Sequence, residues 1–135
     1  QLPLVQRAAQ RYEVALAAPE IGAAFQPYLT HSLLTDVRNQ SEILRFAREL
    51  EVCGVITDQT DVAVRTVAYV AEQLGLPGIG YETSCLFTDK RLMREKMAQL
   101  GIPQLPNRTV YSLREAAAYY AELGGLMVGF EDADA

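Results

Sequence analysis

The stretch from Gly75 to Pro106, GLPGIGYETSCLFTDKRLMREKMAQLGIPQLP, decides the predicted fold of this 135-residue chain. It opens with a loop, because Pro77 lacks an amide hydrogen and the glycines around it disfavour a long helix. Thr88 or Asp89 can cap the helix that follows, and Gly101 is a typical helix stop. The cationic side of that helix consists of Lys90, Arg91, Arg94 and Lys96, and its predicted buried stripe consists of Met93, Met97 and Leu100.

Strands and helices alternate before this stretch. Helical spacing of apolar residues predicts a helix within Gln1–Tyr12, and a second helix is expected to begin with Ser41 as its cap. The run Val52–Asp58 is largely β-branched and apolar, which is typical of a strand buried on both faces of a parallel sheet. The other predicted elements are strands at Glu13–Ala18 and His31–Val37, a short helix at Glu20–Phe25, and a helix ending at Leu74. The apolar face of the helix after Ser41 is predicted to consist of Ile43, Phe46, Ala47 and Leu50.

Further strand and helix signals follow Pro106. Arg108–Tyr111 is predicted to be a short strand, and Ser112 with Glu115 forms a capping-box pattern at the start of a helix. Gly124 ends that helix, and a last strand is predicted at Leu126–Val128. The buried face of the helix is predicted to consist of Leu113, Ala116, Ala117, Tyr120 and Leu123. Because Pro103 and Pro106 break the chain between two helical units, the domain boundary is placed near Leu105–Pro106, between residues 1–105 and residues 106–135.

The repeated strand–helix order predicts an α/β fold with a parallel sheet and right-handed crossovers. Loops that follow the strands of such a sheet share one edge, where ligands bind. Two loops are candidates for that edge, residues 58–61 and residues 78–84. The candidate substrate-binding residues in them are Asp58, Thr60, Asp61, Glu82 and Thr83. Structural readings compete with these roles, because Thr60 can cap the next helix, Asp61 can complement its dipole, and the glycines suit a tight turn.

Composition narrows the classes of function. Half of the residues are hydrophobic and the net charge is -5, which argues against a broad nucleic-acid surface. No apolar run is long enough for a membrane span and no signal-peptide pattern is visible, so a cytoplasmic protein is expected. Cys53 and Cys85 are expected to be free thiols. His31 is the single histidine and has no second ligand at metal-binding spacing, so neither a metal site nor a catalytic residue is predicted.

The order of these motifs resembles the N-terminal part of ATP-grasp ligases, such as carbamoyl phosphate synthase large chain, biotin carboxylase and glycinamide ribonucleotide synthetase. The resemblance covers about Gln1–Leu126 and rests on an apolar strand, a loop, a long helix that ends in Leu-Gly-Leu-Pro-Gly, and then Asp89-Lys90, a helix and Gly101-Ile102-Pro103. It implies a Rossmann-like pre-ATP-grasp domain in residues 1–105, followed by the first elements of the ATP-grasp small subdomain. It also implies that a strand and a Gly-rich turn precede Gln1, so that the chain is expected to be a fragment.

The resemblance implies a reaction as well. The full-length enzyme would use ATP and Mg²⁺ to activate a small-molecule carboxylate as an acyl phosphate, which an amine or a similar nucleophile then attacks. By the same resemblance Lys90 contacts the nucleotide phosphates, although a solvated lysine in the first turn of a helix is an equal alternative. The Lys-Pro pair of the family is missing after Leu126–Val128, and so are the later magnesium ligands and the Gly-rich lid. The isolated chain is therefore expected to hold no cofactor and to be inactive.

A second class of function stays open. The chain can be a non-catalytic doubly wound module that binds a small anionic ligand or serves as a dimer surface, and the missing Lys-Pro pair favours this alternative. A homodimer fits either class, since an incomplete sheet exposes an edge. The coding sequence on both sides separates the two classes, because a preceding strand and later metal carboxylates would indicate the ligase.

Overall fold

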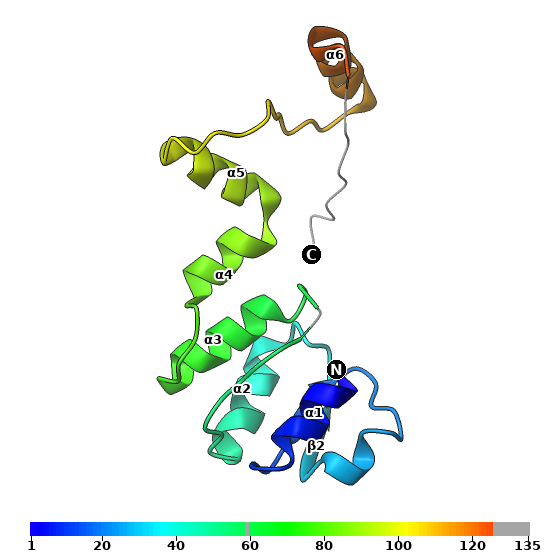
Figure 1. Ribbon diagram of the computed structural model, residues 1–135, viewed down its shortest axis with the longest axis vertical. Coiled ribbons are helices and arrows are strands. Elements are labelled where there is room, and N and C mark those ends of the chain that lie inside the picture. Colours follow the sequence, from blue (N-terminus) through cyan, green and yellow to red (C-terminus); the bar gives the residue numbers. More distant parts are fainter. Residues whose placement is uncertain (59, 126–135) are drawn as a thin grey trace. The chain divides into compact units, whose positions relative to one another are not determined.

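The computed structural model describes residues 1–58 and 60–125. The chain forms two compact units, one of residues Gln1–Asp89 and one that begins at Lys90. Within the described residues there are six α-helices and a small parallel sheet of two strands, and Figure 1 labels the helices along the chain. The predicted α/β class is therefore confirmed at this level. The predicted domain boundary near Leu105–Pro106 stays a prediction.

The sheet lies in the first unit. β1 (Ala15–Ala18) pairs in parallel with β2 (His31–Leu34), and Ala15 stands opposite His31 in the register. Both strands were predicted from the sequence, with longer bounds. The predicted helix at Glu20–Phe25 is wrong, because a turn leads there into a single 3-10 helix, η1 (Gln26–Tyr28). Pro27 lies in the first turn of η1, where its missing N–H costs no hydrogen bond.

The first unit also contains three helices before α4: α1 (Leu2–Ala8), α2 (Gln40–Glu49) and α3 (Val64–Leu74). α2 and α3 pack side by side, as Figure 1 shows. Their buried residues form one apolar cluster of Ile43, Leu44, Ala47 and Val70. The predicted apolar face of α2 is thus correct for Ile43 and Ala47, whereas Leu44 takes the buried place that was assigned to Phe46. The predicted cap is also wrong, because the side chain of Asn39, and not that of Ser41, accepts from the backbone N–H of Glu42.

The run Val52–Asp58 is not a strand. Val52 and Val55 are half-buried against the apolar cluster of α2 and α3, but Ile56 is 68% exposed and Cys53 is exposed too. The prediction of a strand buried on both faces is therefore wrong in this structure. The physical reason is pairing: a strand needs a neighbour for its backbone N–H and C=O groups, and no described residue bonds to the backbone of residues 53–57.

The loop predicted at residues 78–84 is shorter than expected, because α4 (Tyr81–Thr88) begins inside it. Gly80 precedes the helix with φ +81, a conformation that glycine adopts without steric cost. The carboxylate of Glu72 on α3 accepts from the backbone N–H of Tyr81 at 2.9 Å, and the Tyr81 ring meets Tyr69 edge-on. Ser84 is completely buried. These contacts pack α4 on α3, and residues 81–84 are helical for that reason.

The second unit contains α5 (Lys90–Gln99) and α6 (Leu113–Leu123). The predicted stripe of α5 is confirmed only in part, because Met93 and Met97 are half-buried whereas Leu100 is 63% exposed. The capping box of α6 is present: the Ser112 hydroxyl accepts from the N–H of Glu115 at 3.2 Å.

Two further expectations for the second unit are wrong. Arg108–Tyr111 is irregular rather than a strand. Most of the predicted buried face of α6 lies toward solvent, with Leu113 87% exposed and Ala116 half-buried, and the buried residue of this helix is Tyr119 instead. Arg108 covers the Tyr119 ring at 4.4 Å and pairs with Glu122 at 3.1 Å, which explains why that side of α6 is protected. The strand predicted at Leu126–Val128 lies outside the described residues.

Candidate functional site

Polar side chains gather where β2 ends, at the carboxyl edge of the sheet. Thr35 donates a hydrogen bond to the carboxylate of Glu42, and the Asn39 side-chain amide donates to the same carboxylate at 2.9 Å. Arg38 pairs with Asp36 at 2.9 Å. The hydrogen bond from the Arg38 side chain, helped by its backbone N–H, lowers the pKa of Asp36 below its ordinary value. These groups largely satisfy one another, so this cluster serves mainly to fix the start of α2.

The first predicted site loop lies where the segment 52–58 meets α3. The carbonyl of Asp58 accepts from the side-chain amide of Gln1 at 3.1 Å, which brings the start of α1 to this end of the molecule. Thr60 is half-buried and does not cap α3, because the N-cap is Ala63 without a side-chain hydrogen bond. Asp61 is exposed, and its carbonyl accepts from the N–H of Val64 at 3.1 Å. The three residues are near neighbours in the sequence, so their proximity does not test the predicted site.

The second predicted group, Glu82 and Thr83, lies at the other end of α3. Both residues belong to the first turn of α4, which is attached to the last turn of α3 through the bond between Tyr81 and Glu72. Because α3 has 11 residues, its two ends are about 16 Å apart. The structure therefore does not bring Glu82 and Thr83 to Asp58, Thr60 and Asp61. Any binding role of these five residues stays a prediction.

Arg65 and Thr88, which were not among the predicted site residues, are joined by a hydrogen bond at the start of α3. Arg65 lies in the first turn of α3, and its Nε donates to the hydroxyl of Thr88 at 2.5 Å. That hydroxyl in turn donates to the carbonyl of Ser84 at 2.8 Å, so Thr88 is held in place by its own helix. Within the described residues, the terminal nitrogens of Arg65 make no hydrogen bond. An arginine anchored through Nε keeps the fork that binds a carboxylate or a phosphate with two parallel hydrogen bonds.

Lys90 is the first residue of α5 and belongs to the second unit, where it is exposed. Its predicted contact with nucleotide phosphate stays a prediction. No cluster of three histidine, cysteine, aspartate or glutamate side chains suited to a metal ion occurs in residues 1–58 and 60–125. Cys53 and Cys85 are both free, as predicted. None of the helices in these same ranges is long and apolar enough to cross a membrane.

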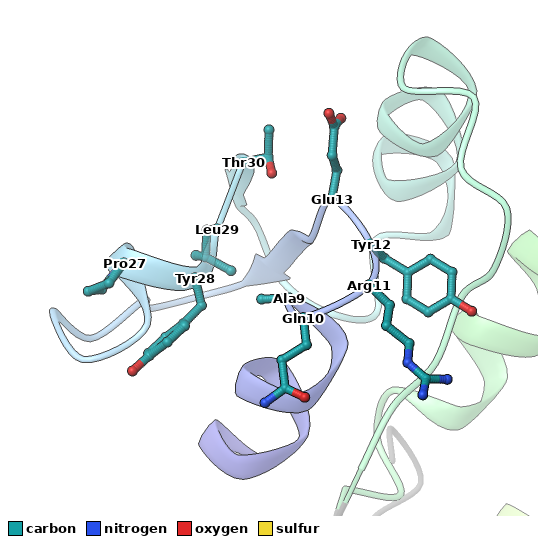
Figure 2. Close-up of a pocket in the computed structure, with 9 residues that line it drawn as sticks. All are labelled: Ala9, Gln10, Arg11, Tyr12, Glu13, Pro27, Tyr28, Leu29 and Thr30. Atoms are coloured by element: carbon teal, nitrogen blue, oxygen red, sulfur yellow. The ribbon is translucent and has the colours of Figure 1, made fainter.

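A hollow of about 450 Å³ opens at the edge of the sheet where the two strands begin, opposite the edge where β2 ends. Figure 2 shows the side chains around it, which come from residues 9–13 and residues 27–30. Glu13 precedes β1 and Thr30 directly precedes β2, so the hollow lies at the amino ends of the strands. Ligands of parallel sheets bind at the carboxyl ends. The hollow contains none of the predicted site residues, and the start of α3 with Arg65 is the better candidate site.

No protein-family model matches the chain, and no curated protein matches it by sequence.

Proposed function

We propose that the chain is the N-terminal part of an ATP-dependent ligase that joins a carboxylate to an amine or a similar nucleophile through an acyl phosphate. The parallel pair β1–β2, with α2 and α3 packed on it, is compatible with a pre-ATP-grasp domain. The Gly/Pro loop before α4 and the Asp89-Lys90 pair at the start of α5 follow in the order of that family.

The observation that carries the proposal is the anchored guanidinium of Arg65. It lies at the start of α3, where the helix dipole alone makes a cation unfavourable and an anion favourable. The bond to Thr88 fixes its orientation before a ligand arrives, so that less side-chain entropy is lost on binding. This arrangement suits a carboxylate substrate better than a neutral one.

The chemistry assigned to the complete enzyme has two steps. A carboxylate oxygen attacks the γ-phosphorus of ATP, the bond to the β-phosphate oxygen breaks, and ADP leaves. The nucleophile then attacks the acyl carbon, and inorganic phosphate leaves. In this scheme Arg65 holds the carboxylate in position, and Lys90 binds nucleotide phosphate.

The test uses the complete protein that carries this chain and needs no knowledge of the natural nucleophile. A panel of carboxylic acids is supplied with ATP and hydroxylamine, which captures an acyl phosphate as a hydroxamate, and ADP release is measured for each acid. We expect ADP release that depends on the acid. Arg65→Met should then raise KM for the acid, and Lys90→Ala should raise KM for ATP, each at least about tenfold, because each removes a charged hydrogen bond.

Lys96→Ala is the matched control, since Lys96 lies on the same helix as Lys90, in its last turn. It should leave both constants unchanged. An unchanged KM for ATP in Lys90→Ala would remove Lys90 from the nucleotide site. If no acid in the panel stimulated ADP release, the non-catalytic anion-binding module would be the better explanation.

A further inference from the structure

Two residues of opposite charge lie one turn apart where α3 begins. The carbonyl of Asp61 accepts from the N–H of Val64 at 3.1 Å, and Ala63 has helical backbone angles, so the turn before α3 continues into the helix. Residues four positions apart are neighbours on the surface of such a turn. The backbone therefore places Asp61 next to Arg65.

This spacing would allow Asp61 and Arg65 to pair with each other, but they do not. Arg65 is half-buried, and its Nε donates to the hydroxyl of Thr88 instead. The Asp61 carboxylate is exposed and, within residues 1–58 and 60–125, forms no hydrogen bond or ion pair. A negative group and the outer nitrogens of a positive group are thus both left open to a ligand.

We propose that the carboxylate substrate held by Arg65 is an α-amino acid and that Asp61 binds its ammonium group. This inference rests on the role proposed for Arg65 and names the class of acid. An α-amino acid carries its two charged groups on one carbon atom, so it can contact two neighbouring side chains of opposite charge. A plain carboxylic acid would leave Asp61 unmatched, and a dicarboxylate or a phosphate would be repelled by it.

The start of α3 sets the direction in which the amino acid binds. The N-terminal amide groups of a helix carry a partial positive charge, which attracts a carboxylate and repels an ammonium group. The carboxylate therefore lies toward the first turn of α3 with Arg65, and the ammonium lies toward the preceding turn with Asp61. An amino group that donates to Asp61 stays protonated, so the attacking nucleophile is a second molecule.

Calorimetric titration of the complete protein that carries this chain tests the proposal. The ligands are the common amino acids and, for each of them, the same acid without its amino group. We expect an amino acid to bind at least about tenfold more tightly than its matched acid, because the matched acid lacks one charged hydrogen bond. Asp61→Asn should remove this difference by weakening only the amino acid, whereas Arg65→Met should weaken both ligands.

Glu49→Gln is the matched control, because it removes the same charge from the exposed last residue of α2. It should change neither affinity. The proposal would be overturned if no amino acid bound, if an amino acid and its matched acid bound equally well, or if Asp61→Asn weakened both alike.

ADP release measured on the same protein separates this inference from the proposed function. If plain acids stimulated ADP release and amino acids bound no better than they did, the ligase would stand and the amino-acid site would fall. If amino acids bound as expected but stimulated no ADP release, the amino-acid site would stand and the ligase would fall.

Discussion

Asp36 and Arg38 form an exposed ion pair directly after β2. We predict that Arg38→Gln raises the pKa of Asp36 back toward its ordinary value, because the dominant cause of the lowered pKa is the hydrogen bond from the Arg38 side chain. A carboxyl whose pKa is lowered on folding stabilises the fold above its unfolded pKa, and this contribution is lost as the pH falls through the folded pKa. The pair is exposed, so the change in stability should be small. An NMR titration of the Asp36 carboxyl carbon measures the shift, and an unchanged midpoint in Arg38→Gln would contradict the assignment.

Single residues also show how far the sequence could define the candidate site. Asp58, Thr60 and Asp61 were selected because they follow an apolar run and precede a helix, and their binding role stays a prediction. Arg65 was missed, since an arginine inside a helical pattern resembles any solvated residue. Its partner Thr88 is 23 positions away, and only the packing of α4 on α3 brings the two together. Glu82 and Thr83 were grouped with the first three residues because the sequence does not show in which direction α4 runs along α3.

The start of α2 gives a prediction at the scale of one element. Asn39 accepts from the N–H of Glu42 at 3.3 Å, whereas the Ser41 hydroxyl only donates to the Asn39 side chain. Asn39→Ala should therefore destabilise the first unit by about 1 kcal/mol. Ser41→Ala is the matched control two residues away and should cost clearly less. Urea unfolding followed by circular dichroism measures both. Equal losses, or a larger loss for Ser41→Ala, would restore Ser41 as the cap that the sequence predicted.

Helices and strands were predicted correctly where residues within or next to each element determine its structure. Both strands, α1 to α3, α5 and α6 follow from apolar spacing, caps and the glycine stops, and Gly101 and Gly124 end their helices with positive φ as expected. The predictions that are wrong concern segments whose structure or burial depends on contacts with other parts of the chain. The run Val52–Asp58 has the composition of a strand but no described neighbour to pair with. On α6 an alanine- and leucine-rich face was chosen as buried, whereas the cation of Arg108 covers the Tyr119 ring instead.

At the scale of the whole molecule, the apolar core is distributed unevenly between the two units. The buried cluster of Ile43, Leu44, Ala47 and Val70 belongs to residues 1–89. Among the described residues from Lys90 onward, Tyr119 is the single buried one. Burial of apolar surface is the main favourable term in folding, so most of the stabilisation that these residues supply must come from the first unit. Sequence composition could not show this, because both halves contain regular helical patterns of leucine, alanine and tyrosine.

This distribution predicts that residues 1–89, expressed alone, unfold cooperatively in urea, and that residues 90–135 alone do not. The first fragment retains α1 to α4, both strands and the bonds that join α4 to α3, so its transition midpoint should lie close to that of the first unit in the whole chain. Val70→Ala is the internal check, because Val70 is fully buried and its truncation should lower the midpoint in the fragment and in the whole chain alike. A fragment 1–89 without a cooperative transition, or one insensitive to Val70→Ala, would show that the core needs residues beyond Asp89.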